Sequence, residues 1–322
     1  MTNKYKLDLS GLDPAAADPA AGTFNEAMRS ALASGGWSFP PESASALRST
    51  MDAGADSYRS PRARTRSIVT DSSTVHARIV DAATPSAVVL HFHPGGFVFG
   101  GAAYQDAALE RMADVIGATV ISVDYRLAPE HPFPAGLDDC EAIARWLIEN
   151  AQAEFGTDRL LITGQSAGAS LAVSTLVRVH ASHPGAFRAA SLFYGNYDAT
   201  RLPLQEDGVV IFREAMDWFY AQYVADPAQR RNPEVSPSYA DLRGLPPCLL
   251  TVGSADALLD DSVLLACHML AADVDVELQV VPGGEHGFES SGLPAAVAAV
   301  SRSDRFLLAH SRSSVVLPSV EG

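Results

Sequence analysis

The sequence is poor in cysteine and has no long apolar runs. Its 322 residues include three cysteines, Cys140, Cys248 and Cys267, and no C-x-x-C pair. This argues against a disulfide framework or a zinc knuckle and favours reduced thiols. No window approaches the roughly eighteen uninterrupted apolar residues of a transmembrane helix, and residues 1–20 lack the apolar segment of a secretory signal. We therefore expect a cytoplasmic protein with no stable membrane association.

Basic residues are also scarce, since 23 Lys and Arg stand against 38 Asp and Glu and give a formal net charge of −15. This balance argues against nucleic acid as a partner, because phosphate binding needs a basic surface. No P-loop, dinucleotide fingerprint or zinc spacing is present, so we expect no cofactor. We also expect no metal, because His91-x-His93 has no further histidine or carboxylate nearby. The oligomeric state is left open, with a homodimer as one alternative.

Short apolar runs alternate with segments of helical length from about residue 60 onward. The runs cover residues 74–80, 86–92, 118–123, 160–163, 189–194, 248–253 and 276–281; the helical segments cover 103–116, 136–153, 167–181, 262–273 and 294–309. Most runs are apolar at consecutive positions, which is typical of strands buried on both faces. This alternation predicts an α/β fold with a mostly parallel sheet between helices. The first two runs are too close for a crossover helix, so we expect them to pair antiparallel at the edge.

Two segments interrupt this alternation. Residues 1–58 contain helix-like stretches and no convincing strand, and residues 199–235 include an aromatic helix at 212–224. An insertion after the carboxyl end of a strand lies over the ligand-binding edge of an α/β sheet. We therefore expect both segments to form a helical cap over a core of residues 59–198 and 236–322.

The sharpest motif is GQSAG at residues 164–168, directly after the run LLIT and before a helix of small residues. This strand–turn–helix setting is that of a nucleophile elbow, which predicts Ser166 as the nucleophile. Such a pattern arises by chance about 0.1 times in a chain of this length, so its context decides the interpretation.

A second motif, HPGGF at residues 93–97, follows the apolar run 86–92. Pro94 has no N–H, so the donors to a developing oxyanion would be Gly95 and Gly96, joined by Ala167 after the nucleophile. A plain glycine-rich turn is the alternative.

The acid and the base of such a site should follow the nucleophile in the chain. Asp256 and His286 each come shortly after an apolar run, which would place them at the same sheet edge as Ser166. For Asp256, a turn or cap is the alternative. Asp260 or Asp261 is predicted to be the N-cap of the helix at 262–273.

These motifs together resemble the hormone-sensitive-lipase-like branch of the α/β-hydrolase superfamily, a branch of bacterial carboxylesterases. The matching stretches, in order, are HPGGF at 93–97, DYRLAPEHPFPA at 124–135, GQSAG at 164–168, DALLD at 256–260 and EHGF at 285–288. The resemblance implies an α/β-hydrolase fold with a helical cap, and a catalytic triad and oxyanion hole made of the residues assigned above. It also implies cis peptide bonds at Ala128-Pro129 and Phe133-Pro134.

The sequence departs from the pattern of the branch at four positions without losing a catalytic group. Pro94 replaces the first glycine of the oxyanion motif, Gln165 replaces an Asp or Thr, and Gly195 and Ala257 each replace a proline. The last three positions border the expected pocket, so these departures bear on substrate choice.

The function expected from these features is that of a serine carboxylesterase acting on short- to medium-chain esters through an acyl-enzyme. An amidase or lactonase with the same triad is an alternative, because the triad does not discriminate between acyl leaving groups. A binding protein without catalysis, as in the plant gibberellin receptor, is disfavoured because that protein has lost the histidine that is present here. Residues expected to line an apolar pocket, unless they only pack the cap onto the core, are Trp37, Phe39, Phe97, Phe212, Trp218 and Phe219.

Overall fold

The computed structural model describes residues 5–34, 41–52, 59–70, 73–204 and 208–312. Its strands are β1 (Tyr5–Asp8), β2 (Ala63–Val69), β3 (Thr74–Val80), β4 (Val88–Phe92), β5 (Thr119–Asp124), β6 (Leu160–Gln165), β7 (Phe187–Phe193), β8 (Cys248–Gly253) and β9 (Val276–Val281). Its α-helices are α1 (Pro19–Ser34), α2 (Ala44–Asp52), α3 (Asp106–Ile116), α4 (Ala135–Phe155), α5 (Ala167–His180), α6 (Arg213–Tyr223), α7 (Leu259–Ala271) and α8 (Pro294–Ser311). Two of its short 3-10 helices are η4 (Ala102–Gln105) and η7 (Phe288–Ser290).

These strands form one sheet in the order β1-β9-β8-β7-β6-β4-β5-β3-β2. Neighbouring strands are parallel except where β3 meets β5 and β2, so the prediction of a mostly parallel α/β sheet is confirmed. The predicted pairing of the runs 74–80 and 86–92 is wrong, because β3 pairs with β5 while β4 lies between β5 and β6. Residues 1–58 also contain a strand, contrary to expectation, since β1 extends the core sheet beside β9.

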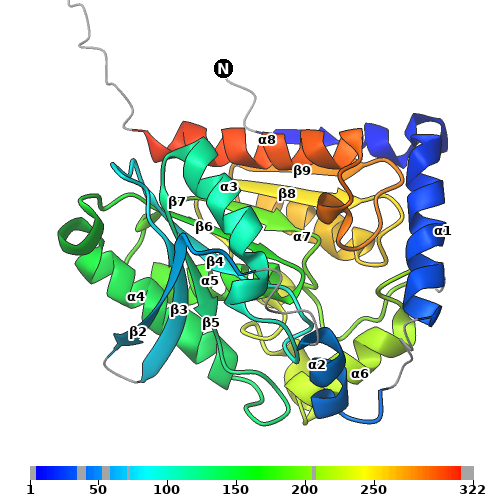
Figure 1. Ribbon diagram of the computed structural model, residues 1–322, viewed down its shortest axis with the longest axis horizontal. Coiled ribbons are helices and arrows are strands. Elements are labelled where there is room, and N and C mark those ends of the chain that lie inside the picture. Colours follow the sequence, from blue (N-terminus) through cyan, green and yellow to red (C-terminus); the bar gives the residue numbers. More distant parts are fainter. Residues whose placement is uncertain (1–4, 35–40, 53–58, 71–72, 205–207, 313–322) are drawn as a thin grey trace, which may run out of the picture.

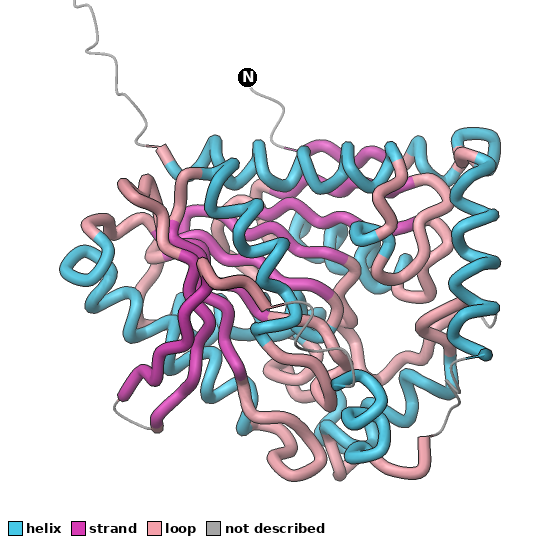
Figure 2. Tube along the Cα trace, in the orientation of Figure 1, coloured by secondary structure: helices cyan, strands magenta, loops and turns pink. Residues whose placement is uncertain are grey.

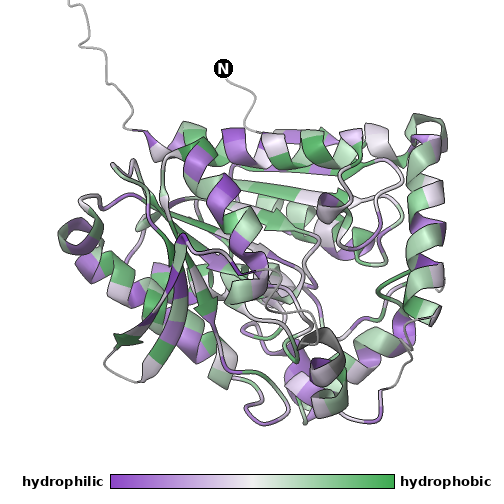
Figure 3. Ribbon diagram, viewed as in Figure 1, coloured by the Kyte–Doolittle hydropathy of each residue, from purple (hydrophilic) through white to green (hydrophobic). Residues whose placement is uncertain are grey.

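Helices cover both faces of the sheet, which explains why the strands are apolar at consecutive positions (Figures 2 and 3). In β4, Val88 and Leu90 pack into the larger core with α4, α5 and α7. Val89 points to the other face, where it joins Leu109 of α3 and Leu307 of α8. No helix within the described ranges is both long and apolar enough to span a membrane.

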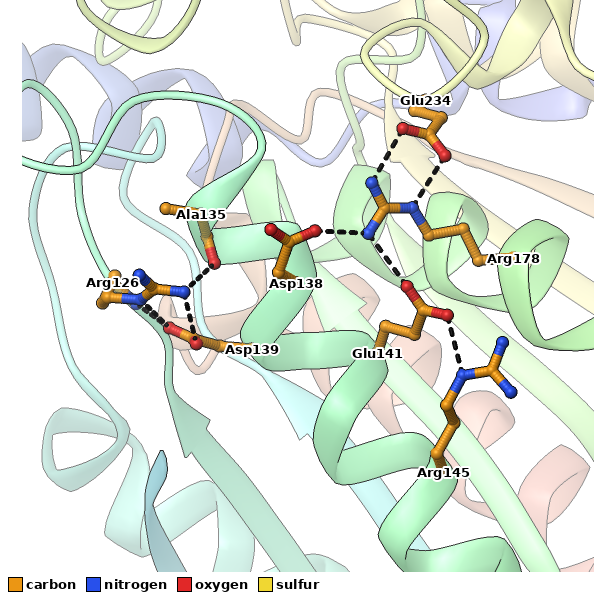
Figure 4. Close-up of polar contacts among 8 residues, drawn as sticks. All are labelled: Arg126, Ala135, Asp138, Asp139, Glu141, Arg145, Arg178 and Glu234. Atoms are coloured by element: carbon orange, nitrogen blue, oxygen red, sulfur yellow. Dashed lines mark hydrogen bonds and ion pairs between the residues drawn. The ribbon is translucent and has the colours of Figure 1, made fainter. Parts of the chain in front are cut away.

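Ion pairs brace the tract 124–135 and the helices next to it (Figure 4). Arg126 holds Asp139 of α4 through two guanidinium N–H bonds and its backbone N–H, all of 2.9 Å. Arg178 of α5 is bonded at 2.7 Å both to Asp138 of α4 and to Glu234, in the segment that leads to β8. These contacts tie four parts of the chain together, namely the tract 124–135, α4, α5 and the segment that leads to β8.

The helices α1, α2 and α6 lie on the right and lower right of Figure 1, away from the strand pair β2–β3. Two of them are anchored to loops that follow strands. Asn25 of α1 donates from Nδ2 to the carbonyl of Gly283 after β9, at 3.0 Å. Arg48 of α2 donates from Nε to the carbonyl of Val98 after β4, at 2.7 Å. These anchors hold both helices at the edge of the sheet where parallel strands end.

Candidate active site

Ser166 sits in the sharp turn between β6 and α5. Its backbone angles, φ 51° and ψ −124°, are unusual for a residue with a side chain and are those of a strained strand-to-helix turn. The backbone N–H of Ser166 donates to the carbonyl of Phe193 at 2.9 Å, which fixes the turn against β7. A Cβ on Gly168 would lie 2.1 Å from the carbonyl oxygen of Phe92, so only glycine lets α5 begin this close to β4.

The structure brings Ser166, His286 and Asp256 together from three separate loops. His286 Nε2 lies 2.9 Å from Ser166 Oγ, while His286 Nδ1 lies 3.0 Å and 3.2 Å from the two carboxylate oxygens of Asp256. All three residues are buried. The sequence therefore predicted correctly which side chains converge at this edge of the sheet.

The electrostatic setting of His286 favours its protonated form. Burial lowers the pKa of His286, but the charge and hydrogen bond of Asp256, together with the other carboxylates nearby, outweigh burial, and the pKa is raised above its usual value. The nearby carboxylates of Glu289 and Glu285 act in the same direction.

The two aspartates after Asp256 have other partners. Asp260 pairs with Arg201 at 2.7 Å, and buried Asp261 accepts backbone N–H bonds from the loop after β7. Their predicted role as N-cap is wrong, because α7 begins earlier, at Leu259. The chain already turns at Asp256, whose carboxylate accepts the N–H of Leu258 at 2.8 Å.

The HPGGF loop after β4 faces Ser166 across a cavity. Gly95 has φ +132°, and a Cβ there would lie 2.0 Å from the carbonyl oxygen of Phe99, so the loop conformation requires glycine. Across the described ranges, the backbone N–H groups of Gly95 and Gly96 donate no hydrogen bond. The N–H of Ala167 belongs to the first turn of α5, where helical N–H groups have no partner inside the helix.

The tract 124–135 packs against the HPGGF loop through Tyr125. The hydroxyl of Tyr125 donates to the carbonyl of His93 at 2.8 Å, and the two rings stack with centroids 4.2 Å apart. The predicted cis peptide bonds at Ala128-Pro129 and Phe133-Pro134 are confirmed.

The rings of His91 and His93 form hydrogen bonds with other groups of the same chain. His91 is bonded through Nδ1 to Ser122 and through Nε2 to Gln165, at 2.7 Å and 2.8 Å, and His93 is bonded to the carbonyl of Pro94. Burial lowers the pKa of both histidines to about 4, so both are neutral supports under the site. No cluster of three potential metal ligands occurs in the described part of the chain.

A cavity of about 420 Å³ opens beside Ser166 and His286. Side chains from four regions reach it, namely α1, the loop with η4, the β7 end with the insertion after it, and η7. Sequence reasoning missed most of the residues that line it, among them Met28, Leu32, Phe99, Tyr104, Gln105, Tyr194, Ile211 and Glu289.

Phe219 of α6 lines this cavity as predicted, whereas three of the other predicted aromatic residues do not. Phe97 is buried and stacks on Tyr223 with ring centroids 3.8 Å apart. Phe212 and Trp218 pack against the core around α6. Trp37 and Phe39 lie outside the described residues.

Comparison with known proteins now identifies the family. The family described as having the α/β-hydrolase fold matches residues 89–290, which is more than half of the chain. The chain belongs to the α/β-hydrolase family. As a member, it is 36% identical over 220 residues to an ethyl acetate hydrolase of Pseudomonas putida, covering 66% of this chain and 69% of the relative. It is 38% identical over 230 residues to a carboxylesterase of Mycobacterium tuberculosis, covering 67% and 71%.

The structure of this hydrolase is also similar to solved esterase structures. A solved esterase from the bacterial hormone-sensitive lipase family superposes with a TM-score of 0.78 at 27% identity, over 91% of this chain and 99% of that one. The resemblance to the hormone-sensitive-lipase-like branch, predicted from the motifs, is confirmed.

Proposed function

We propose that this α/β hydrolase is a serine carboxylesterase that hydrolyses short- to medium-chain esters through an acyl-enzyme. The observation that carries the proposal is the placement of one imidazole between a serine and a carboxylate. His286 Nε2 is 2.9 Å from Ser166 Oγ, and its Nδ1 is 3.0 Å from Asp256 Oδ2. This geometry serves proton transfer from the hydroxyl in acyl transfer. The names of the related ester hydrolases support the same substrate class.

In this proposal, Ser166 Oγ attacks the ester carbonyl while His286 Nε2 accepts the hydroxyl proton. Asp256 keeps the imidazole in the tautomer that presents Nε2 and stabilises the imidazolium that forms. The oxyanion is bound by the N–H groups of Gly95, Gly96 and Ala167. His286 then protonates the leaving alcohol and activates the water that hydrolyses the acyl-enzyme.

The size and the covering of the cavity fit this substrate class. A volume of about 420 Å³ lies in the range of small-molecule sites, roughly 300–1,000 Å³. We also propose that α1, α2 and the segment 199–235 form a helical cap over the core, since Met28 of α1 and Phe219 of α6 both line the cavity.

Three free cysteines support a cytoplasmic location. That the protein forms a homodimer stays a prediction.

A substrate panel tests the proposed function. p-Nitrophenyl esters from acetate to dodecanoate would be run beside a matching anilide and a lactone, with wild-type protein and with Ser166→Ala. We expect the highest kcat/KM on the short and medium esters and its loss in Ser166→Ala. Faster turnover of the anilide or the lactone would instead assign an amidase or a lactonase.

A further inference from the structure

Glu289 is a half-buried acidic residue that the ester mechanism does not use. It belongs to η7, three residues after His286, and it lines the cavity beside Ser166. Its carboxylate oxygen Oε2 is buried and has no hydrogen-bond partner among the described residues. The carboxylate also interacts with the hydroxyl of Tyr194, but a carboxylate with one oxygen unpaired is costly to keep, and a positive charge bound in the cavity would offset that cost.

Four aromatic side chains share the cavity with Glu289. Phe99, Tyr104, Tyr194 and Phe219 line the same cavity, and they come from the β4 loop, η4, the end of β7 and α6. No lysine or arginine is among the described residues that line it. A cavity that combines a carboxylate with aromatic rings suits an ammonium group, because the faces of the rings carry a negative partial charge.

Carboxylates predominate close to His286, although the charge of Arg29 of α1 acts on Glu285, and Arg111 and Arg305 line a neighbouring cavity that Glu289 also borders. Asp256 lies behind His286, and Glu285 is buried nearby, with its carboxylate accepting the N–H of Val209 at 3.3 Å. Burial raises the pKa of Glu289, whereas the neighbouring hydroxyl of Tyr194 acts to lower it. The chain as a whole carries −15. A cation is therefore attracted to this cavity and an anion repelled, most strongly where the walls exclude water.

We propose that Glu289 and the aromatic rings beside it bind an ammonium group, so that the preferred substrates are esters of amino alcohols. The ammonium group would lie against the Glu289 carboxylate while the ester carbonyl faces Ser166. Both residues line one cavity of about 420 Å³, so a small ester can reach them at once. This inference rests on the proposed esterase function and adds that the alcohol part of the preferred ester carries a positive charge.

Two isosteric esters test the proposal. Choline acetate carries a trimethylammonium group, and 3,3-dimethylbutyl acetate has the same shape without the charge. We expect wild-type protein to show a kcat/KM ratio of cationic to neutral ester of about ten or more, since one charge interaction at the cavity wall readily supplies that factor. Because both esters yield the same acyl-enzyme, the ratio reports on the alcohol part alone. A ratio of one or below overturns the proposal.

The variant Glu289→Gln removes the charge with little change of shape. We expect it to lower the ratio about tenfold, whatever its effect on the neutral ester. The matched control is Glu149→Gln, which removes one charge from an exposed position on α4 and should leave the ratio unchanged. An unchanged ratio in Glu289→Gln, or an equal fall in Glu149→Gln, assigns the preference to the overall charge and overturns the site.

A binding measurement separates this proposal from the proposed function. Phenyltrimethylammonium would be titrated into wild-type protein and Glu289→Gln by calorimetry, which needs no turnover. At least a tenfold loss of affinity in the variant supports the cation site even if no ester is hydrolysed. Equal affinity in both proteins, or no binding to the wild type, overturns it even if neutral esters are good substrates.

Discussion

The HPGGF loop offers a sharp test, because the structure separates the residue that stiffens the loop from those assigned as oxyanion donors. In Gly95→Ala, the new Cβ would lie 2.0 Å from the carbonyl oxygen of Phe99, at a φ of +132° that alanine does not adopt. The loop must move, and the N–H groups of Gly95 and Gly96 move with it. Losing one such donor costs about 10²–10³-fold in kcat, or roughly 3–4 kcal/mol of transition-state stabilisation. Pro94 has no N–H to lose, so Pro94→Gly should change kcat by well under tenfold.

The assay is kcat with p-nitrophenyl acetate, with thermal unfolding of each variant as the control for folding. Gly96→Ala adds an internal check, because its Cβ would lie 2.5 Å from the ring of Phe219, a side chain rather than backbone. Gly96→Ala should also lose on the order of 10²-fold, and Phe219→Ala in the same chain should restore part of the loss. If Pro94→Gly is the more damaging change while Gly95→Ala stays active, the donors are wrongly assigned.

Three further predictions concern the acid, the base and the fold. Asp256→Asn should lower kcat about 10⁴-fold, because the imidazole takes the wrong tautomer, whereas Asp260→Asn should keep most activity; the opposite result in a p-nitrophenyl acetate assay would make Asp260 the acid. The pH profile of kcat/KM should fall on the acid side as His286 becomes protonated, and because its pKa is raised, the midpoint should lie above about 6.5 and move down with salt; a midpoint below that value contradicts the assignment. Arg78→Met should lower the free energy of unfolding in urea by about 3–5 kcal/mol, since it leaves the fully buried Asp106 carboxylate without its ion pair, and a loss below 1 kcal/mol would refute that role.

The buried strands were predictable because their side chains are apolar on both faces, as in β6 and β8. The edge strands were not. In β2, Ala63 and Ile68 are the buried residues, and its other positions are half-buried or exposed, so no apolar pattern marks it. β1 has four residues and depends on pairing with β9. The wrong pairing of β3 has a related cause, because closeness in the chain does not determine which strands become neighbours in a sheet.

The converging residues of the site were predictable because each comes shortly after the carboxyl end of a strand, and parallel strands end at one edge. The cavity walls were not predictable in the same way. Phe219 and Trp218 are adjacent aromatic residues on α6, yet only Phe219 faces the cavity, which depends on how the helix is rotated against the HPGGF loop. Glu289 belongs to none of the motifs recognised in the sequence, and only the position of η7 shows that its side chain lines the cavity.

Covalent labelling tests the central claim most directly, because it asks whether Ser166 is the activated nucleophile. Wild-type protein would be treated with a p-nitrophenyl phosphonate ester. Intact-protein mass spectrometry would then count the adducts, and peptide mapping after digestion would locate them. We predict one adduct per chain, on Ser166, and none on Ser166→Ala, whose kcat should fall about 10⁶-fold with the fold unchanged. An adduct on another serine, or a Ser166→Ala protein within tenfold of wild-type activity, would contradict the assignment.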